Sequence, residues 1–475
     1  MTDRAAAAPA LPRTLTLRDL VLFNIVAVMS IRWLATSAAA GPSSLVLWVI
    51  AGLCFFVPQG LAVADLAARY PEEGGIYRWT RRAFGEGHGF VCGWCYWVNN
   101  VLYYPSLLLF VASIAPWAFG TGASGLGNRL SYVLPVTLVG MWLAVLLNVV
   151  GLRTGRWLQN VGGTAAFVPA VLVIALGAYA FVTREPGTPI TPTTLVPNLD
   201  DIGRLNFWAS IAFAYAGLEL SATLAGEVKD PRRTLPMAVF VTAPVVAGVY
   251  LLGTASLLWM VPPDELNVVT AIVQGIAAGV RDLPALAWVV PLAAAAITLN
   301  VLGAVGAWLS GSARVAFAVG LDRYAPPAFG RVHPRWGTPY VAMLVQAVLS
   351  TLFLLISVMG RGTTVERVYL ILLDTMLLVY FVPYVYLFLC YLKDGSGRER
   401  AGEGGREIRT WLTGLSGLAV TLFAMVVACI PPPDTHDPLL FELKVVGGAL
   451  AFVALGGLLY WRARRSGAVE LREAA

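Results

Sequence analysis

Long apolar stretches separated by short polar segments run along the whole chain. A helix needs roughly 20 apolar residues to cross the hydrocarbon layer of a bilayer, and each stretch is long enough to do so. The third and eighth stretches are the longest, so their helices are expected to tilt or to protrude from the bilayer. The pattern predicts twelve membrane-spanning helices, at residues 19–40, 43–68, 88–118, 131–150, 157–183, 206–226, 237–261, 284–318, 339–359, 367–392, 410–430 and 440–461.

Composition agrees with a lipid environment. Of the 475 residues, 58% are hydrophobic and 13% are charged, whereas soluble domains carry about 25% charged residues. Twelve spans use most of this length, so no separate soluble domain is expected. The first twenty residues lack a basic segment followed by an apolar core, and no cleavable signal peptide is expected.

The basic residues predict the orientation of the chain. With the N-terminus inside, the inner segments hold 24 of the 33 Lys and Arg residues and the outer loops hold 7. Cytoplasmic loops of membrane proteins carry this excess of positive charge. We therefore predict a multi-pass protein of a plasma membrane, of the bacterial inner-membrane kind, with both termini cytoplasmic. The pI near 9.1 reflects this topology, and no nucleic-acid partner is expected.

Two spans contain polar and small residues at mid-depth. The first span holds Arg32 among serine, threonine and alanine, and the sixth holds Glu219 close to Gly217. The two features are five spans apart, as expected of inverted five-helix repeats whose discontinuous helices form a site at the midplane. Small polar runs also occur at ordinary helix-packing faces. The residues alone leave both interpretations open.

Four segments resemble the amino acid–polyamine–organocation (APC) transporter superfamily, in order and across nearly the whole chain. The most diagnostic begins Phe-Ala-Tyr-Ala-Gly-Leu-Glu at residue 213 and continues to residue 236. Similarity to the glutamate/γ-aminobutyrate antiporter branch is carried by residues 56–61, 260–267 and 430–434. The four superfamily segments are 64–77, 213–236, 306–314 and 325–339.

The resemblance implies an all-α membrane protein with two inverted five-helix repeats, whose helices 1 and 6 are broken, and two extra C-terminal helices. The implied parts are a cytoplasmic tail at 1–18, the repeats at 19–183 and 206–392, two helices within 410–461 and a tail at 462–475.

The implied function is secondary active transport of an amino acid, as an antiporter or a proton-coupled symporter, by alternating access. The expected partners are an amino acid or related amine, the bilayer and a coupling proton. A polyamine or organic-cation carrier and a non-transporting amino acid sensor remain alternatives. No enzyme, cofactor or metal site is expected, because the spans hold no nucleophile–base pair or set of metal ligands.

The resemblance also implies substrate contacts. A half-helix N-terminus presents unpaired N–H groups to an anion, so the first break would bind the substrate carboxylate through Ser30, Ile31, Arg32 and Trp33. At the second break, the substrate ammonium would donate hydrogen bonds to the carbonyls of Phe213, Ala214 and Ala216. The pocket would be shaped by Tyr215 and Gly217. The substrate side chain would contact Asn99, Asn100, Tyr103 and Trp308.

Arg32 and Glu219 are charged residues inside spans, where a functional role is the default hypothesis. Arg32 could pair with a substrate carboxylate, form a structural ion pair with Glu219 or Asp374, or extend towards an interface. Glu219 could gate or couple transport, or make a helix-packing hydrogen bond. Its position relative to Arg32 would decide its protonation state.

Two further intramembrane charges have several interpretations. Asp374 could be a proton site, a partner for Arg32, a contact for a cationic substrate group, or part of a local structural pair. Arg314 could pair with Asp65 or Asp322 in a gate or scaffold, or contact the substrate. With Glu219, these residues form the predicted gating and coupling set.

Overall fold

The structure, a computed structural model, describes residues 16–70, 75–120, 125–150, 165–197, 202–222, 228–321, 340–396, 404–433 and 435–465, with a few single positions between 324 and 338. Within these ranges the chain is helical and contains no β-strand. The α-helices are α1 (Leu17–Val28), α2 (Arg32–Ala39), α3 (Ser43–Ala51), α4 (Val57–Arg69), α5 (Gly75–Phe84), α6 (Glu86–Ala118), α7 (Leu130–Val149), α9 (Phe167–Thr183), α10 (Pro192–Leu195), α11 (Ile202–Ala214), α12 (Glu219–Ala222), α13 (Pro231–Met260), α14 (Ala271–Gly279), α15 (Val289–Leu321), α16 (Tyr340–Val358), α17 (Val365–Ser396), α18 (Gly404–Val427) and α19 (Pro438–Arg465).

The predicted count of about twelve spans agrees with these helices. Among the described residues, nine continuous helices are long and apolar enough to cross a membrane, and α9 is a shorter apolar helix. The first and sixth spans are each split in two, as α1 with α2 and α11 with α12. The fifth predicted span begins at residue 157, and its part before residue 165 lies outside the described residues.

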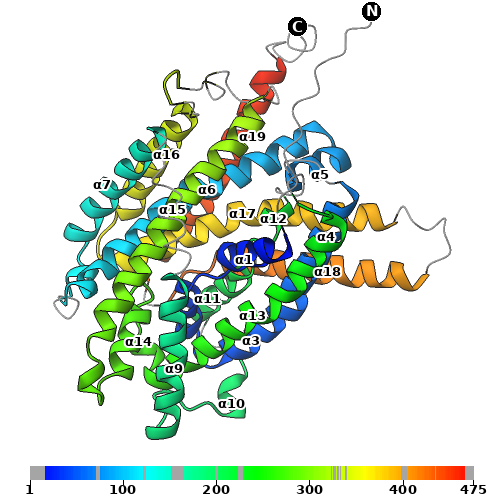
Figure 1. Cartoon of the computed structure of the whole chain (residues 1–475). Helices are drawn as coiled ribbons and strands as arrows, with labels where there is room; N and C mark the ends of the chain where they lie inside the picture. Colours follow the sequence, from blue (N-terminus) through cyan, green and yellow to red (C-terminus); the bar gives the residue numbers. More distant parts are fainter. Residues whose placement is uncertain are drawn as a thin grey trace, which may run out of the picture.

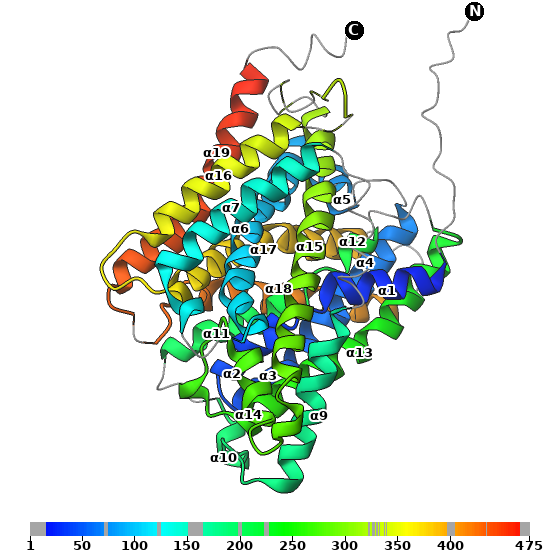
Figure 2. The same ribbon diagram turned by 60° about the vertical axis from the view of Figure 1, so that its left-hand side comes forward.

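Helices α6 and α17 form the centre of the bundle. In an apolar stretch of 18 residues within α17, 89% of the residues are buried, and in α6 the share is 72%. In the corresponding stretch of α7 only 22% of the residues are buried. Helix α6 contacts α15 and α17, and it passes behind α15 in the view of Figure 1. Helices α7 and α16 run side by side in Figures 1 and 2. Polar groups carried by α6 and α17 are therefore shielded from lipid by other helices.

Three short helices, α5, α10 and α14, lie in segments that the hydrophobic pattern predicts as loops. Helix α5 buries Ile76 and Trp79 and exposes Arg78 and Arg82. A search for long apolar stretches cannot detect an amphipathic helix of this kind. Helix α14 has only 9 residues, which is less than a single span requires.

A proline inside α6 ties this helix to α16. Pro105 has no N–H, so the carbonyl of Val101, four residues earlier, has no partner within the helix. The hydroxyl of Ser350 in α16 donates to that carbonyl at 2.5 Å. A side chain of a neighbouring helix thus satisfies the carbonyl, as an apolar environment requires.

Candidate functional site

The first span is interrupted between Val28 and Arg32, although this segment contains neither glycine nor proline. Tyr250 of α13 satisfies the freed backbone groups on both sides of the gap. Its hydroxyl donates to the Val28 carbonyl at 2.7 Å and accepts the Ser30 N–H at 3.1 Å. The break is therefore stabilised by a tertiary contact rather than by a local helix-breaking residue.

The second break separates α11 from α12 and contains a glycine in a conformation that other residues rarely adopt. Gly217 has φ +131°, which is accessible because glycine has no Cβ. Its N–H donates to the hydroxyl of Tyr384 at 2.8 Å. On the other side of the gap, the Ala214 carbonyl is 3.2 Å from the hydroxyl of Tyr250.

Tyr250 therefore joins the two breaks, and its side chain is fully buried. Its ring stacks on Trp48 with 4.5 Å between centroids, and Trp48 in turn makes an edge contact with Tyr215. Tyr250 is not among the residues predicted from the sequence. Its only signal is a tyrosine in the middle of an apolar span, which resembles any large packing residue.

Arg32, at the first turn of α2, is 1% exposed. Its guanidinium lies over the rings of Trp33 and Tyr103, at 4.3 and 5.0 Å from their centroids, and donates to the Ser106 hydroxyl at 3.3 Å. Among the described side chains, no carboxylate lies within 4.0 Å of it, and its Nε has no hydrogen-bond partner. The ion pairs with Glu219 or Asp374 that the sequence allowed are absent from this conformation.

The predicted backbone donors at the first break are partly occupied. The N–H of Ser30 is used by Tyr250, and the N–H of Trp33 donates to the Ser30 carbonyl at 3.1 Å. Within the described chain, no hydrogen bond involves the N–H groups of Ile31 and Arg32. These two donors, together with the Arg32 guanidinium, are available to an anion.

Glu219, at the start of α12, is buried in a cluster of hydrogen-bond donors. Distances of 3.1 to 3.4 Å separate the carboxylate from Gly217, Gln59 and Tyr96. The cluster connects α4, α6 and α17 to the second half of the broken sixth span. The five donors are the hydroxyls of Tyr96, Tyr380 and Tyr384, the side-chain amide of Gln59 and the backbone N–H of Gly217.

Among the residues predicted to contact the substrate, Tyr103 of α6 lies against Arg32 of α2. Trp33 makes an edge contact with Phe213, with 5.2 Å between centroids. Asn99 and Asn100 are buried, and the side-chain oxygen of each lacks a hydrogen-bond partner. These two oxygens can accept hydrogen bonds from a ligand.

Trp308 and Arg314 both lie on α15, and their side chains are outside the described part of the structure. Asp65, one proposed partner of Arg314, forms an ion pair with Arg69. Asp322 is also outside the described residues. The predicted roles of Trp308 and Arg314 therefore stay predictions.

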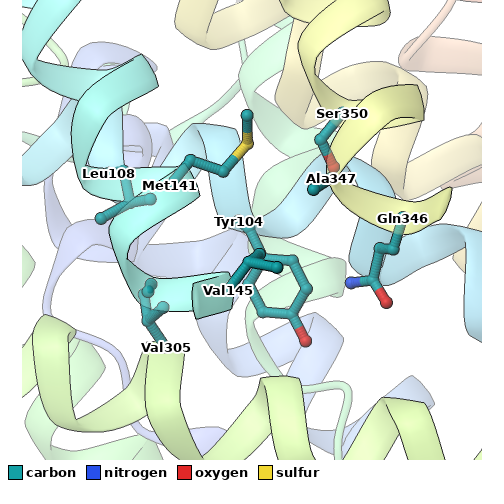
Figure 3. Close-up of a pocket in the computed structure, with 9 residues that line it drawn as sticks. Tyr104, Leu108, Met141, Val145, Val305, Gln346, Ala347 and Ser350 are labelled. Atoms are coloured by element: carbon teal, nitrogen blue, oxygen red, sulfur yellow. The ribbon is translucent and has the colours of Figure 1, made fainter. Parts of the chain in front are cut away.

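A narrow gap, too small to hold a water molecule, lies among α6, α7, α15 and α16 (Figure 3). Gln346 lines it, and both polar atoms of this buried amide lack partners. None of the predicted substrate contacts lines the gap. It is therefore separate from the paired helix breaks.

Comparison with known proteins agrees with this architecture. The solved structure of MhsT in complex with L-phenylalanine superposes with a TM-score of 0.55 at 15% identity, and the match covers 93% of this chain and 98% of that one. At 15% identity this likeness shows a shared fold and nothing further.

Relatives extend over most of the chain. An uncharacterized transporter of Legionella pneumophila is 32% identical over 453 residues, covering 93% of this chain and 95% of the relative. A probable agmatine/putrescine antiporter of Lactococcus lactis is 23% identical and covers 90% of each chain. A glutamate/gamma-aminobutyrate antiporter of the same species is 23% identical and covers 85% of this chain and 83% of its own.

The profile of a protein family described as amino acid permease matches residues 15–450. This match confirms the superfamily resemblance predicted from the four sequence segments. The chain belongs to the amino acid permease family of membrane transporters.

Proposed function

We propose that this protein is a secondary active transporter of an amino acid or a related amine, which works by alternating access around a site at the two helix breaks. The observation that carries the proposal is the meeting of both breaks at Tyr250. Paired discontinuous helices at mid-membrane expose backbone donors and acceptors to a substrate in transporters of this type.

The first break is the proposed carboxylate site. The N–H groups of Ile31 and Arg32 lie at the positive end of α2, where an anion is stabilised. The Arg32 guanidinium adds a planar donor that suits a carboxylate, and it has no carboxylate partner among the described residues. A bound carboxylate would supply the missing counter-charge.

The second break is the proposed ammonium site, through the carbonyls of Phe213, Ala214 and Ala216. The Ala214 carbonyl already has a long contact with Tyr250 at 3.2 Å, which a stronger cationic donor could replace. Asn99, Asn100, Tyr103 and Trp308 are proposed to contact the substrate side chain.

Glu219 is proposed to gate the pathway and to take part in coupling. Tyr380 and Tyr384 of α17 both donate to its carboxylate. Breaking these bonds would free α12 from α17, as an alternating-access movement requires. Arg314 is proposed to act in the same gate, and both termini are proposed to face the cytoplasm of a bacterial cell.

Transport by reconstituted protein tests the proposal. Proteoliposomes would be assayed with L-glutamate, γ-aminobutyrate, agmatine, putrescine, L-serine and L-threonine, with and without a counter-substrate inside and under imposed pH or sodium gradients. Saturable uptake of an amino acid supports the proposal, whereas uptake of amines alone indicates a polyamine carrier. Saturable binding without transport of any solute would indicate a sensor.

A further inference from the structure

The strongest unexplained polar feature is a carboxylate in the middle of α17. Asp374 is 1% exposed, and its Oδ2 accepts a hydrogen bond from Nδ2 of Asn206 at 3.0 Å. Its Oδ1 has no hydrogen-bond partner. No Lys, Arg or His among the described residues lies within 4.0 Å of it.

A buried carboxylate in this state needs a compensating charge. An ionised carboxylate away from water is strongly destabilising unless a cation or several hydrogen bonds offset it. One hydrogen bond from a neutral amide stabilises the ionised carboxylate less than a cation or several hydrogen bonds would. The vacant Oδ1 of Asp374 therefore identifies a place where a positive charge can bind.

A proton is the cation that this place fits best. Asn206 already donates its amide hydrogens to Asp374 and to the Ile430 carbonyl, at 3.0 and 2.9 Å. A metal ion or an ammonium group needs several oxygen ligands and room to enter. A proton needs only the single free oxygen, and the 1% exposure of Asp374 leaves little space for anything larger.

The neighbouring titratable groups leave Asp374 without another charge partner. Tyr369, on the same helix, is a neighbouring titratable group and carries no positive charge. Cys429, which follows α18, is another neighbouring titratable group without positive charge. From α11 the facing group is the neutral amide of Asn206. In the described part of the chain, Arg32 and Asp374 form no ion pair.

Asn206 connects Asp374 of α17 to the broken sixth span. Asn206 belongs to α11, the first half of the broken sixth span, whereas Gly217 and Glu219 hold the second half to Tyr384. Both attachments end on α17, at Asp374 and at Tyr384. One helix therefore holds the two halves of the broken span through two separate polar contacts.

We propose that Asp374 is a proton-binding site, separate from the Glu219 cluster, whose occupancy controls the attachment of α11 to α17. When Asp374 is ionised, Asn206 makes a charge-assisted hydrogen bond, which is stronger than a bond to a neutral acid. When a proton binds to Oδ1, the carboxyl becomes neutral, the bond from Asn206 weakens, and α11 is held less firmly. Proton release restores the stronger bond.

Infrared spectroscopy tests the site directly and needs no substrate. Protein labelled with [4-¹³C]aspartate would be reconstituted in nanodiscs, and difference spectra would be recorded between pH 5 and pH 9. We expect a protonated-carboxyl band that changes with pH and is lost in Asp374→Asn. In Asp374→Glu the carboxyl carries no ¹³C, because only aspartate is labelled. The pH-dependent band should therefore appear at the frequency of an unlabelled carboxyl. The proposal would be overturned if the labelled wild-type and Asp374→Asn proteins gave the same pH-dependent carboxyl bands.

Transport tests the coupling, which rests on the function proposed above. In Asp374→Asn, uptake driven by a pH gradient should fall at least tenfold, while exchange at equal pH continues at a rate close to wild type. Gradient-driven uptake at the wild-type level would contradict the coupling role. If the wild-type protein transports nothing and the infrared band is still present, the transport proposal fails and the proton site stands.

Discussion

The hydroxyl of Tyr384 lies 2.8 Å from the backbone nitrogen of Gly217, so a side chain of α17 holds the second helix break at the residue where the chain turns out of helical geometry. The same hydroxyl donates to Glu219, two residues further on. The shape of this break therefore depends on two conditions: a residue that tolerates φ +131°, and an acceptor for its N–H.

Gly217→Ala should impair folding and transport together. A Cβ at φ +131° strains the backbone, and such strain costs about 1–3 kcal/mol. Thermal unfolding in detergent, combined with uptake in proteoliposomes, measures both effects.

The matched control is Gly248→Ala in α13, where an added Cβ meets no atom within 4 Å. In a helix interior this change should be neutral or stabilise by up to about 1 kcal/mol. Equal loss of stability in both variants would show that backbone geometry at Gly217 is not the cause.

Arg32→Met should separate ligand binding from stability. Arg32 has no carboxylate partner among the described residues, so an apolar side chain of similar length should leave the melting temperature unchanged or raise it. Binding of a substrate that carries a carboxylate should weaken about tenfold or more, which corresponds to about 1.4 kcal/mol. Binding to purified protein and thermal unfolding are the two measurements.

Arg184→Met provides the contrasting case. Arg184 pairs with Asp282 at 2.8 Å and donates to the carbonyls of Ala278 and Gly279 at the end of α14. Its replacement should lower the melting temperature, because partly buried carbonyls lose their donor. If Arg32→Met destabilises the protein as much as Arg184→Met does, Arg32 is a structural residue.

Tyr250→Phe should loosen both helix breaks while preserving the aromatic packing on Trp48. The variant removes the acceptor of the Ser30 N–H and the donor to Val28, and a buried group left without its partner costs about 1–3 kcal/mol. We expect reduced stability and slower uptake at saturating substrate.

Tyr386→Phe is the control for this change. Its hydroxyl contacts His88 at 2.8 Å, at an exposed position away from the breaks. It should have little effect on stability or uptake. A Tyr250→Phe variant that behaves like this control would show that the hydroxyl does not stabilise the breaks.

Ser350 and Pro105 should be energetically coupled. Ser350→Ala leaves the Val101 carbonyl without a donor and should destabilise the protein by about 1–3 kcal/mol. In a Pro105→Ala background the helix can supply the missing N–H itself, so the same change should cost less. A double-mutant cycle of unfolding free energies measures the coupling, and additive effects would contradict this account.

The positions of the spans and of their two interruptions could be predicted from the sequence, because lipid imposes long apolar stretches and makes polar residues within them conspicuous. Arg32, Glu219 and Asp374 are recognisable for this reason. The amphipathic helix α5 was not predictable in this way, since its apolar residues alternate with arginines.

The partners of the charged residues could not be predicted. Tyr250, Tyr380 and Tyr384 lie in apolar spans, where a tyrosine that forms hydrogen bonds and one that only packs have the same sequence pattern. The similar depth of Arg32 and the acidic residues in the membrane suggested an ion pair between them. The side chains face different directions, so Glu219 bonds to tyrosines and Asp374 bonds to Asn206.

The hydroxyl of Tyr250 carries a single hydrogen, although two carbonyls, of Val28 and Ala214, lie within reach at 2.7 and 3.2 Å. The two broken spans therefore compete for one donor. A displacement that draws the hydrogen towards Ala214 leaves the first span with an unsatisfied carbonyl, and the reverse displacement leaves the second span with one. This competition favours two arrangements of the breaks, one with the Tyr250 hydrogen on Val28 and one with it on Ala214, over an intermediate arrangement.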